Sequence, residues 1–270
     1  MMEKTVLEEQ IVSMLTKGLV RPKISVVGCG GAGSNIVSSM YWNSDSEIET
    51  IAVNTDEDKL RDIDAHKKIL IGKDITQGNG ADGLPEVGER CAECARDVFD
   101  DTLGDSEIVF VIAGMGGGTG TGAAPILAEV AKEKGAVTFA IAINPFSHEA
   151  DRCERARDGI DRLKEATETT IVLENDRLLD IAGDMPLRET FSIMERSIMK
   201  IIQSVDVKIN ESFYTQIESD VKDMLSEMND EDMKNLSQNG SAPMPMDPYQ
   251  QMDMGHWDMS NGFDTDLGPY

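Results

Sequence analysis

The chain has 270 residues, of which 50 are acidic and 25 basic, and its formal net charge at pH 7 is −25. A protein this acidic lacks the basic surface to which nucleic-acid backbones and anionic lipids bind, so we expect neither as a partner. No segment approaches the roughly 20 apolar residues that span a bilayer, and an apolar content of 40% suffices for one sizeable core. We therefore expect a globular, cytoplasmic protein without direct membrane insertion.

The first elements are a helix, a strand and a glycine-dense segment. Apolar residues recur at helical spacing within residues 1–22, and residues 23–27 are typical of a short strand that precedes a helix over 36–41. The segment between them fits the G-x-G-x-x-G pattern, in which a backbone without side chains approaches a pyrophosphate. Its glycines are Gly28, Gly30 and Gly33.

A second predicted strand, 48–53, ends at Asn54-Thr55-Asp56. Asp56 follows the first glycine segment at about the distance of a ribose-binding acid, so this region alone leaves a nicotinamide-dependent oxidoreductase open. The alternative for Asn54 and Asp56 is structural, namely a turn and the N-cap of a helix over 58–63.

A long loop, 72–85, follows a predicted strand over 68–71 and is expected to be functional because a simple connection would be shorter. Pro85 begins a helix that runs to about residue 100. Cys91 and Cys94 could bind zinc or act in redox chemistry, but no second pair accompanies them. We interpret them as core residues and expect no metal site made of side chains alone. The predicted buried face of this helix holds Val87, Cys91, Cys94 or Ala95, and Val98.

The most specific signal lies at residues 110–122. An apolar strand ends near Gly114, and a glycine-dense turn at 116–122 opens a helix over 123–134. Glycines allow φ > 0 and have no Cβ, so successive backbone N–H groups can approach an anion at a helix N-terminus. The pattern predicts a phosphate cradle. The alternative, a flexible linker, would not need to lie between a buried strand and a helix.

Further along, the predicted elements are strands at 136–143 and 169–173, a charged helix between them that ends at residue 167, and a helix that begins at Pro186. Together these segments resemble the tubulin/FtsZ family of GTP-binding proteins. The resemblance is carried by GGGTGTG at 116–122, NTD at 54–56, T-x-G-x-G-A-x-G-x-P at 76–85, P-F-x-x-E at 145–149 and N-D-R-L-L at 175–179.

The resemblance implies GTP or GDP as the ligand, with Mg²⁺, at the carboxyl ends of the strands of a doubly wound α/β domain. Residues 116–121 would hold the α- and β-phosphates, and residues 76–83 would sense the γ-phosphate. The implied nucleotide-binding residues are Gly30, Gly31, Ala32, Asn35, Asn54, Asp56, Thr76, Gly78, Gly80, Ala81, Gly83, Gly116, Gly117, Gly118, Thr119, Gly120, Thr121, Pro145, Glu149, Arg152, Asn175, Phe191 and Glu195.

At the base, the resemblance implies that Asn175 contacts the guanine edge and Phe191 stacks on the ring. Glu195 stands where the family commonly has Asp or Asn, and a carboxylate can accept from guanine N1–H and N2–H, which adenine does not offer. Near the ribose, Ala150 replaces the family's usual glycine after Glu149, and Arg152 aligns only if one residue is deleted. The alternative for Glu149 and Arg152 is an ordinary pair in the first turn of a charged helix.

Beyond Phe191 the resemblance weakens. Neither glycine nor proline occurs between residues 186 and 239, and apolar residues recur at helical spacing, so we expect helix, with a break near Asp206 left open. Glu218 and Asp220 resemble the acid-bearing end of the family's catalytic loop and are the candidate catalytic residues. The alternative is that they are solvent-facing acids on an amphipathic helix.

The predicted organisation is an N-terminal helix (1–22), a GTP-binding domain (23–205) with a mainly parallel sheet, an amphipathic helix (206–228) in place of the catalytic loop region, and a disordered acidic tail (229–270). We expect the family's second, C-terminal α/β domain to be missing. The tail would either dock a protein partner through its aromatic and Met residues or act only as a solubilising segment.

The leading hypothesis is an FtsZ-like GTP-binding protein whose GTP hydrolysis is slow or depends on assembly, with a role in cell division or a related cytoskeletal process. It would associate with itself or with FtsZ-type subunits. An alternative is a non-hydrolysing nucleotide-binding partner or cap of full-length FtsZ filaments. A remote alternative is the nicotinamide-dependent oxidoreductase.

Overall fold

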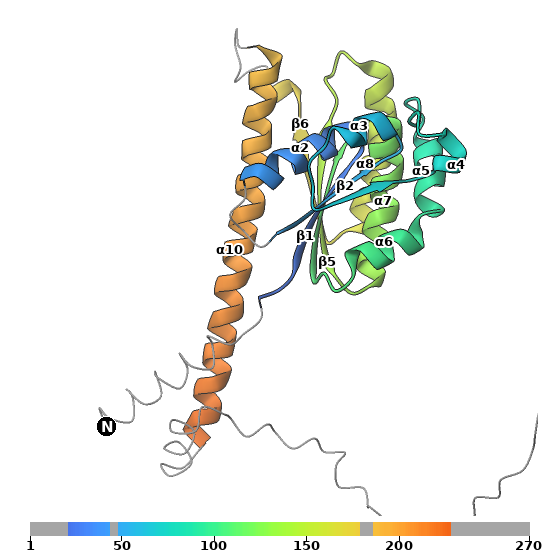
Figure 1. The fold of residues 1–270 in the computed structure, drawn as a ribbon. Helices are drawn as coiled ribbons and strands as arrows, with labels where there is room; N and C mark the ends of the chain where they lie inside the picture. The colour runs from blue at the N-terminus through green and yellow to red at the C-terminus, as the bar shows by residue number, and fades with distance from the viewer. Residues whose placement is uncertain (1–20, 44–47, 179–185, 228–270) are drawn as a thin grey trace, which may run out of the picture. The chain divides into compact units, whose positions relative to one another are not determined.

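The computed structural model describes residues 21–43, 48–178 and 186–227 (Figure 1). The chain divides into two compact units, one of residues 19–217 and one of residues 1–18 with 218–270. The helix expected within residues 1–22 and the tail expected at 229–270 lie almost wholly outside the described residues.

A six-stranded parallel sheet forms the centre of the larger unit, which confirms the predicted doubly wound α/β fold. The strand order is β3-β2-β1-β4-β5-β6, so the sequence order reverses direction between β1 and β4. In such sheets ligands bind beyond the carboxyl ends of the strands at this reversal. The strands are β1 (Ile24–Cys29), β2 (Glu49–Asn54), β3 (Lys67–Leu70), β4 (Ile108–Gly114), β5 (Val137–Asn144) and β6 (Thr169–Glu174).

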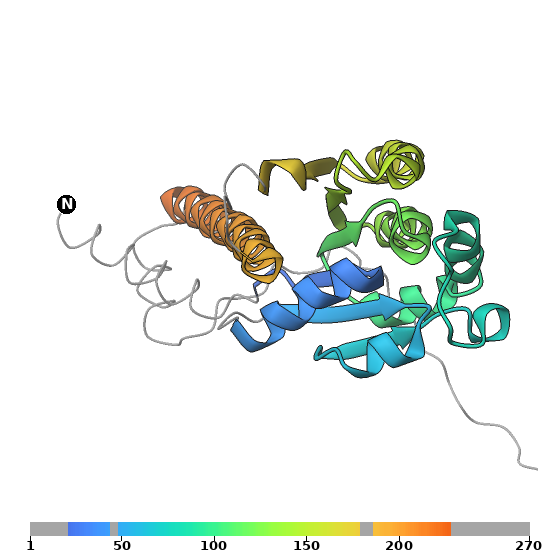
Figure 2. The same cartoon turned by 90° about the horizontal axis from the view of Figure 1, so that it is seen from above.

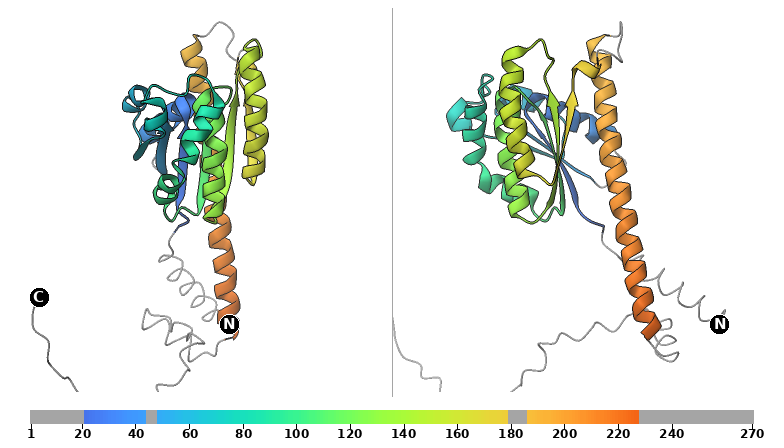
Figure 3. Two further views of the ribbon diagram at one scale, coloured as in Figure 1. Left: turned by 90° about the vertical axis from the view of Figure 1, so that its right-hand side faces the viewer. Right: turned by 180° about the vertical axis from the view of Figure 1, so that it is seen from behind.

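Helices cover both faces of the sheet, as Figures 2 and 3 show. One face packs against α2 (Gly30–Asn43), α3 (Glu57–Arg61) and the first half of α10 (Leu187–Glu227). The other packs against α5 (Pro85–Glu93), α6 (Arg96–Leu103), α7 (Gly118–Glu133) and α8 (Ala150–Ala166). A short helix, α4 (Lys73–Thr76), lies in the connection from β3 to α5. Because both faces are covered, the central strands β1 and β4 are buried along almost their whole length.

Glycines let α5 and α7 approach until their backbones touch. A Cβ on Gly122 of α7 would lie 2.0 Å from the Pro85 carbonyl oxygen, and one on Gly88 of α5 would lie 2.3 Å from the Gly118 carbonyl oxygen. An ion pair also links α8 to α5. The guanidinium of Arg162 on α8 donates two hydrogen bonds, of 2.7 and 2.8 Å, to the Glu89 carboxylate on α5. The helix that opens at the glycine-rich turn is thus held firmly against its neighbours.

The sequence placed two helix starts too late. The helix expected from residue 36 begins at Gly30, and the one expected from residue 123 begins at Gly118. Glycines of the two glycine-rich segments allow close packing inside helices and do not serve only to form a turn. For example, a Cβ on Gly33 in α2 would lie 2.3 Å from the Ile112 carbonyl oxygen of β4. Tertiary packing therefore overrides the low helix propensity of glycine.

The single helix expected over 85–100 was also wrong. It is broken at Cys94 and Ala95 into α5 and α6. Of the residues expected on its buried face, Cys91 and Ala95 are buried and Val87 is partly buried, whereas Cys94 and Val98 are exposed. In contrast, α10 continues without interruption through Asp206, where a break had been left open.

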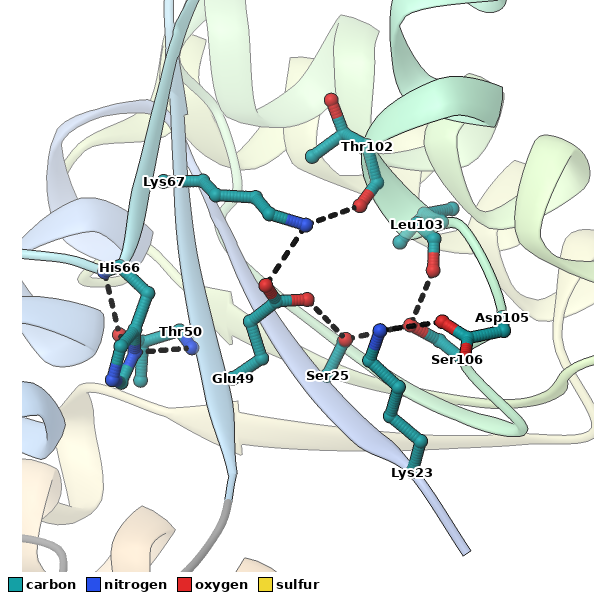
Figure 4. A network of polar contacts seen from close by, with 10 residues as sticks. All are labelled: Lys23, Ser25, Glu49, Thr50, His66, Lys67, Thr102, Leu103, Asp105 and Ser106. Atoms are coloured by element: carbon teal, nitrogen blue, oxygen red, sulfur yellow. Dashed lines mark hydrogen bonds and ion pairs between the residues drawn. The ribbon is translucent and has the colours of Figure 1, made fainter.

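A network of polar contacts links the amino-terminal ends of the strands, at the opposite end of the sheet from the carboxyl ends (Figure 4). The Lys67 ammonium lies 2.8 Å from a Glu49 oxygen and donates to the Thr102 carbonyl, which ties β3 and β2 to α6. The buried hydroxyls of Ser25 and Ser106 share a 2.7 Å hydrogen bond between β1 and the turn before β4.

No helix among residues 21–43, 48–178 and 186–227 is long and apolar enough to cross a membrane.

Candidate nucleotide-binding cleft

Two adjoining cavities lie at the carboxyl ends of the strands, and Ala32, Gly114 and Arg152 line both. We call the smaller one, of about 340 Å³, the glycine cavity, and the larger one, of about 1070 Å³, the aromatic cavity. Predicted site residues that line the glycine cavity are Gly30, Gly31, Ala32, Asn54, Asp56, Gly80, Ala81, Gly83, Gly117, Gly118, Thr119, Gly120 and Arg152. Those that line the aromatic cavity are Ala32, Asn35, Pro145, Glu149, Arg152, Asn175, Phe191 and Glu195.

The glycine cavity forms where β1 and β4 end side by side. Gly30 follows β1 with φ +71, and a Cβ there would lie 2.9 Å from the Gly120 backbone nitrogen. Gly117 is the N-cap of α7 and has no side chain to cap the helix. The first residues of α7 therefore border a cavity that is lined in large part by glycines, and such an arrangement binds anions at helix N-termini.

Asn54, at the end of β2, presents an unsatisfied donor to the glycine cavity. Its Oδ1 accepts from the backbone N–H groups of Thr55 (2.9 Å) and Asp56 (3.3 Å), which fixes the orientation of the amide. Its Nδ2 is buried and has no hydrogen-bond partner, although the residue is only 3% exposed. A buried donor of this kind costs about 1–3 kcal/mol unless a ligand or water accepts from it.

The loop between β3 and α5 closes one side of the glycine cavity. The Thr76 hydroxyl donates to the Gly72 carbonyl (3.1 Å) and accepts from the Gly78 N–H (3.2 Å). The Gly80 N–H in turn donates to the Thr55 carbonyl (3.2 Å). Thr76 and Gly78 thus do not line the cavity but hold in place the residues that do.

Gly116 and Thr121 have a similar supporting place around the other glycine turn. Gly116 adopts φ +84, and its N–H donates to the buried Thr121 hydroxyl at 2.8 Å. A Cβ on Gly116 would lie 2.6 Å from the Arg152 carbonyl oxygen, so this position requires glycine. Both residues shape the turn beneath the cavity lining without being part of it.

Asp56 caps α3 as the structural alternative expected, and it also lines the glycine cavity. Its Oδ1 accepts from the Lys59 N–H at 3.0 Å, and its Oδ2 lies 3.0 Å from the Lys59 ammonium. The hydrogen bond from the Lys59 N–H, helped by that ammonium, holds the pKa of the Asp56 carboxyl below its usual value, against the opposing effect of burial.

Replacing Asp56 with alanine is expected to lower the free energy of unfolding by about 1 kcal/mol near neutral pH, because α3 loses its cap. The native pKa of Asp56 is depressed, so its contribution is present above the unfolded-state pKa and is lost as the pH falls through the native pKa. Urea unfolding of both proteins across the acid range checks this. Asp58→Ala, at an exposed ion pair with Arg61 on the same helix, should change little. A difference that persists in acid below the native pKa would contradict the cap.

The aromatic cavity lies between α2, α10 and the ends of β5 and β6. Asn175 begins the helical turn after β6, and its buried Oδ1 has no hydrogen-bond partner while the residue is 9% exposed. The rings of Phe146 and Phe191 lie nearby, with centroids 6.4 Å apart. An apolar wall beside an unsatisfied acceptor suits a flat, hydrogen-bonding ring.

Glu149 and Arg152 form the pair that the sequence left open between a ribose contact and a structural role. The guanidinium of Arg152 donates to Glu149 Oε1 at 2.6 Å, and the other carboxylate oxygen accepts from the Phe146 N–H at 3.1 Å. Burial alone would raise the pKa of Glu149, but these two hydrogen bonds outweigh it, and the pKa lies below its usual value. Both residues also line the aromatic cavity, so their pairing with each other does not exclude a contact with a ribose.

Glu218 and Asp220 are not among the residues that line either cavity. Both are exposed side chains of α10 in the second compact unit, and Glu218 pairs with Lys222 at 2.6 Å. Sequence reasoning missed several lining residues, above all Ser39, Lys59 and Asp82. Asp82 adopts φ 48, which is uncommon for a residue other than glycine. Lys59 and Asp82 lie within or beside recognised motifs, which could have indicated them.

Comparison with known proteins agrees with the fold. Residues 23–183 match the tubulin/FtsZ family, GTPase domain. The cell division protein FtsZ 2 of Halobacterium salinarum is 42% identical over 208 residues, which cover 77% of this chain and 52% of the relative. FtsZ 2 of Methanocaldococcus jannaschii is 42% identical over 205 residues, 76% and 54% of the two chains. The chain thus spans about half the length of the curated relatives it matches.

Solved structures give the same result. An empty FtsZ dimer from M. jannaschii superposes with a TM-score of 0.67 at 38% identity, over 74% of this chain and 58% of that one. CetZ2 from Haloferax volcanii, a GTPγS-bound protofilament, superposes with a TM-score of 0.57 at 21% identity, over 79% of this chain and 62% of that one. This is a likeness of fold alone. The family match, the identity and the parallel sheet agree, and the chain belongs to the tubulin/FtsZ family.

Proposed function

We propose that this chain binds guanine nucleotides, with the phosphates in the glycine cavity and the base in the aromatic cavity. The observation that carries the proposal is a pair of buried amide atoms without hydrogen-bond partners, Asn54 Nδ2 in one cavity and Asn175 Oδ1 in the other. The first is a donor, which suits a phosphate or ribose oxygen, and the second is an acceptor, which suits a base N–H. One ligand with a base at one end and phosphates at the other would satisfy both.

At the phosphate end, backbone N–H groups at the start of α7 would bind the α- and β-phosphates, and the loop at residues 80–83 would border the terminal phosphate. Lys59 and Arg152 would supply positive charge in a protein whose net charge is −25. The carboxylates of Asp56 and Asp82 line the same cavity, and this oxygen-rich lining suits Mg²⁺ held mainly by phosphate oxygens.

At the base end, guanine is favoured over adenine by the polar groups that line the cavity. Asn175 Oδ1 and the Glu195 carboxylate are both acceptors, and the Watson–Crick edge of guanine offers two neighbouring donors, N1–H and N2–H. A nicotinamide-dependent oxidoreductase, which the first glycine segment alone left open, gains no support from the second glycine turn or from membership of the tubulin/FtsZ family.

Equilibrium titration with GTP, GDP and ATP tests this function. We expect GTP and GDP to bind and ATP to bind at least about 100-fold more weakly, because adenine has no N1–H or N2–H to pair with Asn175 Oδ1 and the Glu195 carboxylate. Equal affinity for GTP and ATP would contradict the proposal.

We further propose that GTP hydrolysis is slow or depends on assembly, with a cytoplasmic role in cell division or a related cytoskeletal process. Glu218 and Asp220 would act on a nucleotide held by another copy of this chain or by an FtsZ-type subunit. In that case turnover per molecule rises with protein concentration, and Glu218→Ala with Asp220→Ala abolishes the rise but leaves GTP binding unchanged.

If turnover is absent at every concentration, the alternative of a non-hydrolysing partner or cap of FtsZ filaments replaces this one. The tail at 229–270 would then be a candidate docking segment for a protein partner.

A further inference from the structure

Two side chains that lie far apart in the sequence meet inside the aromatic cavity. The Ser39 hydroxyl on α2 donates a 2.9 Å hydrogen bond to Glu195 Oε2 on α10, across a separation of 156 residues. Both residues line the aromatic cavity and also a neighbouring cavity of about 510 Å³. The hydrogen bond between Ser39 and Glu195 therefore lies between two cavities, where packing alone would not fix the conformation of the Glu195 side chain.

Helical spacing arranges four side chains around the space for the base. Asn35 and Ser39 are four residues apart on α2, and Phe191 and Glu195 are four residues apart on α10, so each pair shares one face of its helix. All four line the aromatic cavity. An amide and a hydroxyl on one side thus face an aromatic ring and a carboxylate on the other.

The length of the glutamate makes its orientation important. Glutamate has one more rotatable bond than aspartate, so it loses more conformational freedom when it is fixed in one geometry. The hydrogen bond from Ser39 holds one carboxylate oxygen, while each carboxylate oxygen has a further lone pair for the edge of a base. The charge is thereby pre-organised before a ligand arrives, which reduces the cost of binding.

We propose that Ser39 is a positioning residue that holds the Glu195 carboxylate against the N1–H and N2–H groups of guanine. Through this contact, Ser39 would set the preference for guanine over a base that lacks the 2-amino group. This inference rests on the proposed guanine-nucleotide function. It assigns to Ser39 a role through Glu195 and no direct contact with the reacting phosphates.

The test compares equilibrium binding of GTP with that of ITP, whose base lacks the 2-amino group, in the unchanged protein and in Ser39→Ala. The unchanged protein prefers GTP, and Ser39→Ala loses roughly three- to tenfold in GTP affinity and less in ITP affinity, so the GTP-to-ITP ratio falls. Ser39→Thr, which keeps the hydroxyl, restores the ratio. Ser197→Ala is the matched control, because that exposed α10 hydroxyl donates only to the Ile193 carbonyl, and it leaves the ratio unchanged.

The ratio separates positioning from a general loss of structure, since a partly unfolded protein loses GTP and ITP affinity equally. If the unchanged protein prefers GTP to ATP but Ser39→Ala keeps the GTP-to-ITP ratio, the inference about Ser39 is wrong and the proposed function stands. Equal binding of GTP and ATP by the unchanged protein overturns both.

Discussion

Replacing Gly122 with alanine is expected to lower the free energy of unfolding by about 3 kcal/mol or more, since overpacking by one methyl group commonly costs 1–3 kcal/mol and here meets only backbone. The added Cβ would lie 2.0 Å from the Pro85 carbonyl oxygen and 2.5 Å from the Glu89 nitrogen. Neither atom can move by a side-chain rotation. To relieve the contact, α5 must shift away from α7, and α5 carries the loop that borders the glycine cavity.

Thermal and urea unfolding of the nucleotide-free protein measure this loss. Gly31→Ala is the matched control, because Gly31 lies in α2 without a positive φ, and a Cβ added there would meet nothing within 4 Å. Alanine there should leave stability unchanged or raise it slightly through helix propensity. Equal stability of the two variants would show that α5 and α7 do not pack as closely as described.

Replacing Asn54 with aspartate is expected to weaken GTP and GDP binding by about 100-fold or more, because a donor is lost and a negative charge is placed where phosphate oxygens would lie. The substitution is nearly isosteric. Its Oδ1 can still accept from the N–H groups of Thr55 and Asp56, so the turn after β2 keeps its hydrogen bonds. The loss therefore reports on the cavity side of the residue.

Calorimetric titration with GDP, together with the melting temperature of the free protein, checks this expectation. Asn79→Asp adds the same charge to an exposed residue of the same cavity and should weaken binding much less, since solvent screens it. A folded Asn54→Asp protein that binds GDP as tightly as the unchanged one would rule out the proposed place of the phosphates.

Much of the fold could be predicted from local pattern. Apolar runs that end in glycine-rich turns, with helical periodicity between them, indicate buried parallel strands joined by crossover helices. Helix boundaries were less accessible. Gly30 and Gly118 have the composition of a turn and lie in helices because neighbouring backbones require a residue without Cβ. The break between α5 and α6 falls at Cys94 and Ala95, where neither glycine nor proline marks it.

The candidate site was predictable where motifs carry it and not where tertiary contact creates it. Asn54 and Asn175 could be named from their motifs, but their unsatisfied amide atoms are visible only once burial is known. The contact of Ser39 with Glu195 joins two residues that are 156 positions apart in the sequence, and no local pattern at either position indicates it. The places of Thr76 and Thr121, as supports beneath the cavity lining, likewise follow from hydrogen bonds that no spacing predicts.

We expect one guanine nucleotide to fill both cavities, and a crystal structure of the chain with GDP would show whether it does. The phosphates should give density against the N–H groups at the start of α7, and the base should give density between Asn175 and Phe191. Asn54 Nδ2 and Asn175 Oδ1 would then each lie within hydrogen-bond distance of the ligand. Density for GDP elsewhere on the molecule, with these two atoms still unpartnered, would contradict it.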